Sequence, residues 1–351
     1  MTIKDIARES GYSVGTVSRT LNQAGGVSEK ARKKIMEIVR KYDFELNNNA
    51  RHLKKQSKDG VAIIIKGSNN MLFASAVEHL QGMIRDREYA CMVYYISEDD
   101  NEVEQAIRIC QERNPYGILF LGCNKDNFRK KFSSISIPCV QVTSGAGDLE
   151  FDNLSSVGTD DVEAARYAVN HLFSYGHRKI GILGGDATKS EAAHERYLGI
   201  LKAFEDHGLD FREEHQYEMA YFSISEGYSA AKRLIKKMPE MTALFAMADV
   251  TAIGAIRALN DSGYRIPEDI SVIGFDGLEI GAYLVPKLTT IHQNLQGIAM
   301  KSVEILMDNI DNGISAMHEL EPFYLVPGET VIRRKTNGSK GQSDMKQKGQ
   351  I

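Results

Sequence analysis

The sequence has few cysteines and no long apolar run, and both absences exclude whole classes of protein. Its four cysteines, Cys91, Cys110, Cys123 and Cys139, lie far apart, with no Cys-x-x-Cys pair and no partnering histidines. This spacing argues against a disulfide framework or a zinc site and is typical of reduced structural thiols. Without a long apolar run, neither a signal peptide nor a membrane span is expected. The sequence predicts a cytoplasmic protein with no metal and no cofactor.

Signatures of catalysis are also missing. Asp160 and Asp161 are adjacent carboxylates, but they stand at an expected helix start, where acidic residues are favoured in any case. GILGGD at 181–186 is rich in glycine but lacks the spacing of a GxGxxG or GxxxxGK[ST] phosphate loop. With no nucleophile or metal cluster, an enzyme of sugar metabolism is a weaker interpretation than a binding protein.

Charge is segregated along the chain. The 351 residues carry a net charge of −4, and their hydrophobic (42%) and charged (26%) fractions suit two or three globular domains. Residues 1–58, however, hold thirteen Lys or Arg and six Asp or Glu, a net of +7, which leaves −11 on the remainder. A small basic module on a larger acidic body is expected when only one end meets a polyanion. A solvated basic face without a partner is the alternative.

The first 45 residues predict three short helices. Thr2, Ser13 and Ser28 each stand where a side chain can cap a helix start. Residues 47–59, NNNARHLKKQSKD, are polar and basic, which indicates a linker between domains. The tail from Arg333 is polar and is expected to be disordered.

Between the linker and the tail, short apolar runs alternate with helical periodicity. The runs lie at 60–65, 91–96, 117–121, 139–142, 179–183, 243–247 and 271–275, and helices are expected around 74–88, 102–113, 161–176, 193–208, 225–237, 249–262 and 294–312. This alternation indicates an α/β fold in which parallel sheets are covered by helices on both faces. Seven or more strands suit two doubly wound lobes better than one.

A helix-turn-helix pattern occupies the first 22 residues. Ala7 lets two helices pack closely, Gly11 supplies the turn, and Val17 fixes the second helix on the first. The second helix would then present its N-terminal side chains to a DNA major groove.

Gly15 is the unexpected residue of that second helix, because glycine there costs roughly 0.5–1 kcal/mol relative to alanine. It would leave room for close approach to DNA, where Val14 could contact a thymine methyl and Arg19 could read a base by hydrogen bonding. The remaining expected DNA contacts, which would position the helix on phosphates, are Thr16, Ser18 and Asn22.

These residues carry a family resemblance. The stretch TIKDIARESGYSVGTVSRTLN resembles the opening of the lactose and galactose repressor family (LacI/GalR). NNNARHL (47–53) resembles the family's hinge, and GHRKIGILGG (176–185), ISVIGFD (270–276) and PKLTTIHQN (286–294) resemble its core signatures in order. The resemblance covers residues 2 to about 332. It implies a helix-turn-helix head, a hinge helix and a two-lobed core like that of periplasmic binding proteins.

The resemblance also implies partners: a palindromic operator bound by a homodimer, and a small effector, a sugar or sugar derivative, with no membrane association. The hinge helix would fold on DNA and insert Leu53 into the minor groove, with Ala50 and Arg51 as further hinge contacts. Leu46 replaces a proline usual in the family, so folding of the hinge would cost more conformational entropy. A flexible linker in which Leu53 has no such role is the alternative.

Strand ends predict where the effector binds, because ligands of doubly wound sheets bind beyond the carboxyl ends of strands. The resemblance implies contacts from Arg196 and Asp276. The other expected effector contacts are Asn70, Phe73, Thr143 and Asp249. Structural roles are open for three of these residues: a strand-end cap for Asp276, a surface ion pair for Arg196 and a helix cap for Asp249.

Two departures from the family leave the effector's identity open. Ala248 stands where the family often has asparagine, which removes an amide from the expected pocket. A common Asn-Pro-aromatic-aromatic stretch is here Asn70-Met71-Leu72-Phe73, so that Phe73 is its only aromatic residue.

The sequence therefore predicts a helix-turn-helix domain at 1–46, a hinge at 47–59, a two-lobed effector-binding and dimerisation core at 60–332, and a tail at 333–351. The expected function is that of a transcriptional regulator, a repressor and not an enzyme, whose operator affinity changes when a sugar-like effector binds between the lobes. A periplasmic sugar-binding protein would share the two-lobed fold, but the basic head argues against it.

Overall fold

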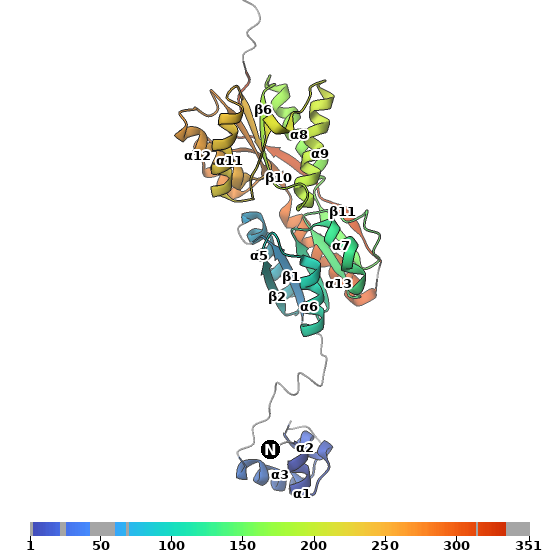
Figure 1. Ribbon diagram of the computed structural model, residues 1–351. Coiled ribbons are helices and arrows are strands. Elements are labelled where there is room, and N and C mark those ends of the chain that lie inside the picture. The colour runs from blue at the N-terminus through green and yellow to red at the C-terminus, as the bar shows by residue number, and fades with distance from the viewer. Residues whose placement is uncertain (1–2, 22–25, 43–59, 68–69, 314, 335–351) are drawn as a thin grey trace, which may run out of the picture. The chain divides into compact units, whose positions relative to one another are not determined.

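The chain forms two units, Met1–Ser57 and Lys58–Ile351. The computed structural model describes residues 3–21, 26–42, 60–67, 70–313 and 315–334 (Figure 1). The expected hinge and its residues Leu46, Ala50, Arg51 and Leu53 lie outside the described residues, as do Thr2 and Asn22.

The first unit is the predicted three-helix head. Its helices are α1 (Ile3–Ser10), α2 (Val14–Leu21) and α3 (Glu29–Lys41). Ile6, Ala7, Val17, Ile35 and Ile38 form its buried core. Ala7 and Val17 thus make the expected contact between helices, and Gly11 adopts the left-handed conformation, φ +73°, that the turn requires. Ser28 caps α3 by accepting a hydrogen bond from the Ala31 amide at 3.3 Å, as predicted.

The second unit begins with a lobe built on six parallel strands in the order β11-β5-β4-β3-β1-β2. These strands are β1 (Val61–Lys66), β2 (Cys91–Ile96), β3 (Gly117–Leu121), β4 (Cys139–Val142), β5 (Leu154–Gly158) and β11 (His318–Leu320). Helices α5 (Met71–Asp86) and α13 (Leu295–Asn312) pack on one face, and α6 (Glu102–Arg113) and α7 (Lys125–Lys131) pack on the other. The central strands β1, β3 and β4 are buried along nearly their whole length because both faces are covered.

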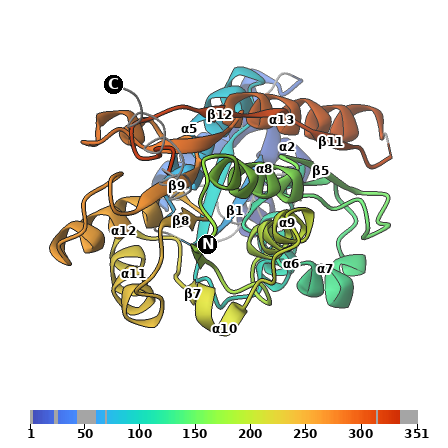
Figure 2. The same ribbon diagram turned by 90° about the horizontal axis from the view of Figure 1, so that it is seen from above.

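The other lobe repeats this plan with the order β12-β10-β9-β8-β6-β7. Its strands are β6 (Ile180–Gly184), β7 (Tyr217–Met219), β8 (Ala243–Ala246), β9 (Ser271–Asp276), β10 (Thr289–Gln293) and β12 (Phe323–Val326). Its helices are α8 (Asp161–Ser174), α9 (Glu191–Asp206), α10 (Glu213–Gln216), α11 (Ile224–Lys237) and α12 (Asp249–Asp261). Figure 2 shows α8 and α9 on one side of the sheet and α11 and α12 on the opposite side.

The chain passes between the lobes at three places: from β5 to α8, from β10 to α13, and from β11 to β12. Each lobe is therefore built from segments that are distant in the sequence. The carboxyl ends of β5 and β10 lie where the chain leaves one lobe for the other, so side chains at these ends stand near the boundary between lobes.

All seven predicted strands are present, and the two-lobed α/β fold is confirmed. The sequence patterns did not predict β5, β7, β10, β11 and β12, nor the short helices α7 and α10. The sheets are parallel as predicted except at one edge, where β12 runs antiparallel to β10, with Ile291 opposite Leu325.

Part of the expected disordered tail is packed on the core. The Arg334 amide donates to the Tyr175 carbonyl at 2.8 Å, and the Arg333 guanidinium lies 5.2 Å from the centre of the Tyr175 ring. Residues 335–351 lie outside the described residues. Among the helices that the structure describes, none has the length and apolarity needed to cross a membrane.

Candidate functional site

One cavity is lined by residues of both lobes. It contains about 900 Å³ of space free of protein atoms, part of which is open solvent. Five of the six expected effector residues line it: Asn70, Phe73, Thr143, Arg196 and Asp276. The structure therefore brings strand ends and helix starts from distant parts of the chain around one space, as the strand-end rule predicts.

Arg196 is at the bottom of the cavity and is almost fully buried. Its Nε donates to Asp161 at 2.8 Å, and its Nη1 donates to the Met247 carbonyl and lies 3.7 Å from the Asp276 carboxylate. The guanidinium also stacks on the Phe275 ring, 3.7 Å from its centre. Arg196 is thus not a surface ion pair; it is a buried cation held by two carboxylates and an aromatic face.

Asp276 ends β9 with φ at +116°, a conformation that non-glycine residues rarely adopt. Thr143, beyond the end of β4, has φ at +70°, which is unusual for a β-branched residue. Strain of this kind costs on the order of 1–3 kcal/mol per residue and tends to occur at functional sites. Both residues line the cavity, where the predicted strands β4 and β9 end.

Burial raises the pKa of Asp276 to about 7, against the opposing effects of the Arg196 charge and a 2.8 Å hydrogen bond from Gln293. Burial likewise raises the pKa of Asp161 to about 6, although Arg196 lowers it. One guanidinium therefore does not fully compensate the two buried carboxylates beside it.

Asp249 does not line the cavity, contrary to expectation. Its fully buried carboxylate accepts hydrogen bonds from the Thr290 hydroxyl at 2.6 Å and from the Leu278 amide at 2.7 Å. Both oxygens are occupied by the protein, which gives Asp249 a role in fixing the segment after β9. The neighbouring Ala248 lines the cavity in its place.

Lys66 and Glu98 enter the cavity from the ends of β1 and β2. The Lys66 ammonium is bound 3.0 Å from Glu102, which also accepts from the Asn124 amide at 2.7 Å and the Asn127 side chain at 2.9 Å. The half-buried Glu98 has no hydrogen-bond or ion-pair partner among the described residues. Burial and the neighbouring Asp99 raise the pKa of its carboxyl.

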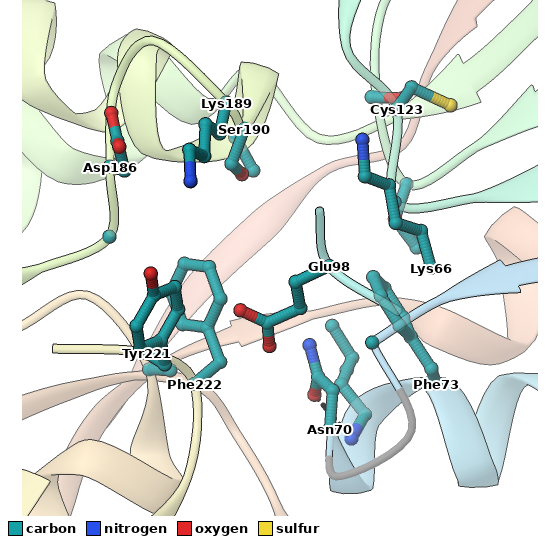
Figure 3. Close-up of a pocket in the computed structure, with 18 of the residues that line it drawn as sticks. Lys66, Asn70, Phe73, Glu98, Cys123, Asp186, Lys189, Ser190, Tyr221 and Phe222 are labelled. Carbon is teal, nitrogen blue, oxygen red and sulfur yellow. Dashed lines mark hydrogen bonds between the residues drawn. The ribbon is translucent and has the colours of Figure 1, made fainter. Parts of the chain in front are cut away.

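Tyr221, Phe222 and Asp186 enter the cavity from the other lobe and were not predicted from the sequence. Figure 3 shows the Glu98 carboxylate directed into the space between Tyr221 and Phe222 on one side and Asn70 and Phe73 on the other. Gly185 makes this possible, because a Cβ there would lie 3.0 Å from the Phe222 ring. Within the glycine-rich segment 181–186, Gly185 thus leaves room for an aromatic ring.

Polar contacts hold the lobes together beside the cavity. Lys125 in α7 lies 2.7 Å from Glu191 and 3.4 Å from Glu195, both in α9 of the other lobe. The Glu191 amide also donates to the Cys123 carbonyl at 3.2 Å, and Lys189 lies 2.6 Å from Asp99. The structure is therefore one in which the lobes are in direct contact around the cavity.

The head presents the predicted surface on α2. Val14 is 45% exposed, and Gly15 and Arg19 are also exposed. Outside its own helix backbone, a Cβ on Gly15 would come within 4 Å of the Ser13 hydroxyl alone among the described residues, at 3.8 Å, so no described contact in the head requires glycine. The Thr16 hydroxyl lies 3.0 Å from the Ser13 hydroxyl, so the two side chains are hydrogen-bonded to each other at the start of α2.

Two domain families match the chain. Residues 2–47 match the bacterial regulatory proteins of the lacI family, and residues 169–331 match the periplasmic binding protein-like domain. The first match contains the helix-turn-helix and the second lies in the two-lobed unit.

Relatives and solved structures match over nearly the full chain. The HTH-type transcriptional repressor PurR of Haemophilus influenzae strain PittEE is 28% identical over 95% of this chain and 98% of its own. The fold is shared with the transcriptional regulator CelR in complex with cellobiose (TM-score 0.69, 21% identity, 94% of this chain and 100% of that one). It is also shared with the lac repressor dimer bound to operator and the anti-inducer ONPF (TM-score 0.69, 23% identity, 95% and 99%).

The HTH-type transcriptional regulator MalR of Clostridium butyricum is 32% identical over 346 residues, which are 95% of this chain and 99% of MalR. Identity at this level over almost the whole of both chains, together with the helix-turn-helix match, shows that this chain belongs to the lacI family of bacterial transcriptional regulators.

Proposed function

We propose that this regulator is a repressor whose operator affinity is set by a small polyhydroxylated effector held between its two lobes. The observation that carries the proposal is the cavity whose walls come from both lobes and contain five of the six expected effector residues. A ligand that contacts both lobes binds one arrangement of the lobes better than another, and this difference in affinity is what shifts an equilibrium.

The walls suit a sugar or a sugar derivative. Aromatic faces from Phe73, Tyr221 and Phe222 can pack on the apolar face of a pyranose ring, while carboxylates and amides fix its hydroxyls in direction. Among proteins with the same fold, CelR is in complex with cellobiose, and a regulator from Enterococcus faecium is bound to ribose. Asn70, Thr143, Arg196 and Asp276 are the proposed hydrogen-bonding contacts.

At the other end of the chain, α2 is the proposed reading helix. Val14, Gly15 and Arg19 would meet base edges, and Thr16, Ser18 and Asn22 would meet phosphates. The hinge residues Ala50, Arg51 and Leu53 are proposed to enter the minor groove. A palindromic operator would require two heads, and hence a homodimer. The proposed location is the cytoplasm.

The experiment begins with an operator selected from random DNA by the full chain, and with a thermal-shift screen of sugars. Operator affinity is then measured with and without each stabilising ligand. We expect a change of about 5- to 150-fold for a true effector. Calorimetry must show operator DNA changing the affinity for that ligand by the same factor, because coupling is reciprocal. A ligand that binds the cavity yet leaves operator affinity unchanged would refute the proposal.

A further inference from the structure

The basic residues that line the cavity already have carboxylate partners. Three basic residues line it, Lys66, Lys189 and Arg196, and so do three acidic ones, Glu98, Asp186 and Asp276. Lys66 and Arg196 are held by buried carboxylates, Glu102 at 3.0 Å and Asp161 at 2.8 Å, whereas Lys189 forms an exposed ion pair with Asp99 at 2.6 Å. Each cation among the described lining residues therefore already has an anion.

Glu98 stands apart from the other five carboxylates. Asp186 accepts hydrogen bonds from the amide and hydroxyl of Thr188 at 2.9 and 2.6 Å, and Asp276 accepts from Gln293. Glu98 has no such partner within the described part of the chain, and its Cγ and Oε1 pack against the backbone at Gly67. The charges of Lys189 and Lys66 favour the ionised form of Glu98, but no described residue donates a hydrogen bond to it. Such a half-buried carboxylate is costly unless a ligand supplies the missing donor.

The surroundings of Glu98 favour a cation over a neutral donor. Tyr221 and Phe222 lie on one side of its carboxylate and Phe73 on another (Figure 3). Aromatic faces attract cations through their quadrupole, and in a partly desolvated site this attraction adds to that of the carboxylate. An anionic ligand would meet the carboxylates of Glu98 and Asp186, and it would have to compete with Glu102, Asp99 and Asp161 for the lining cations.

From this geometry we infer that the effector is a cationic polyol, an amino sugar or amino-sugar alcohol, whose protonated amine binds Glu98 between the aromatic rings. The inference rests on the proposed function, since it names the chemical class of the ligand that occupies the same cavity. It excludes sugar phosphates and sugar acids as effectors.

The test uses the full chain and a panel of matched compounds. Each skeleton, among hexoses, pentoses and their disaccharides, is supplied as the neutral sugar, the amino sugar, the N-acetylated amino sugar and the phosphate. We expect at least one amino sugar to bind about 10- to 150-fold more tightly than its neutral parent, the range for a charged hydrogen bond. The N-acetyl form should lose this gain, because it keeps the nitrogen but not the charge. A panel in which the neutral sugars or the phosphates bind as well as the amines, or in which no amine binds, would overturn the inference.

Variants show whether Glu98 is responsible. Glu98→Gln should remove the preference for the amine while leaving the affinity for the neutral parent within about twofold, because glutamine retains the shape and an acceptor. Glu112→Gln, an exposed carboxylate of the same lobe, removes one negative charge far from the ligand and should change neither affinity. If Glu98→Gln keeps the amine preference, Glu98 is not its origin and the inference fails. The proposed function is refuted by a different result, namely that a ligand of any charge binds in the cavity and leaves operator affinity unchanged.

Discussion

Replacing Gly15 with alanine should stabilise the head and lower its affinity for the operator. Gly15 is the second residue of α2, and an added Cβ would meet only the Ser13 hydroxyl, at an ordinary contact distance of 3.8 Å. With no clash to offset it, the better helix propensity of alanine should raise the free energy of unfolding of the head by about 0.5–1 kcal/mol. The structure of the head alone therefore gives no reason for glycine.

We propose that the reason lies in contact with DNA. If the backbone at Gly15 closely approaches the base edges, a methyl group there must displace the helix from the groove. Overpacking of this kind costs about 1–3 kcal/mol, which corresponds to a loss of about 5- to 150-fold in specific affinity. Non-specific binding depends on charge and should be unaffected.

Two measurements on the full chain separate these effects. Hydrogen exchange of α1, α2 and α3 reports the stability of the head, and fluorescence anisotropy reports affinity for operator and for unrelated DNA. Gly15→Val is the matched control, because valine has poorer helix propensity than alanine but is larger. Affinity should fall from glycine to alanine to valine, whereas protection should peak at alanine. Unchanged operator affinity in Gly15→Ala would show that the glycine is incidental, and reduced protection would show that the head itself requires it.

Three further predictions concern the core. Arg196→Ala should lower its free energy of unfolding in urea by about 3–5 kcal/mol, because Asp161 and Asp276 are left buried without their cation; a loss below about 1 kcal/mol would contradict this. The pKa values of Asp161 and Asp276 are raised from 3.8 to about 6 and about 7, so both carboxyls bind protons more tightly in the folded than in the unfolded chain. Their contribution to the free energy of unfolding must therefore decline as pH rises from about 4 to 7. Asp276→Asn should therefore be more stable relative to wild type at pH 8 than at pH 5, and an equal difference at both would count against the shift. Lys125→Met removes the cation that lies between Asp148 of one lobe and the carboxylates of α9 in the other, so calorimetry should show several-fold weaker effector binding. The control variant at an exposed residue, Arg129→Gln, should leave effector affinity unchanged.

The sequence patterns predicted the strands whose buried residues are apolar, and they missed buried strands that contain polar residues. β10 reads TTIHQ, and the Thr290 hydroxyl donates to Asp249, 41 residues away in the sequence. β5 reads LSSVG, and its Ser156 hydroxyl lies 2.9 Å from His318. Such residues fit a core only because tertiary partners satisfy them, and no local periodicity reports those partners.

The site shows the same division. The rule that ligands bind beyond strand ends led to Thr143 and Asp276, both of which line the cavity. The same rule could have found Glu98, two residues after the predicted strand β2. It could not have found Tyr221 and Phe222, because β7 has only three residues and no apolar pattern. For Asp249 the rule failed, since a carboxylate at the start of a helix can turn toward a neighbouring backbone amide instead of the cavity.

Asp276 gives the cavity a physical route to the segments that join the lobes. Arg196, which lies beside it, binds Asp161 at the start of α8, immediately after the chain has passed from β5 into the second lobe. Gln293 donates to Asp276 from the end of β10, immediately before the chain returns toward α13. A ligand group that competes for the Asp276 carboxylate must therefore weaken or redirect contacts at two of the three connections between lobes. Because these side chains are almost fully buried in the protein alone, and two carboxylates share one guanidinium, we expect a change in one partner to alter the contacts of the others and with them the arrangement of the lobes.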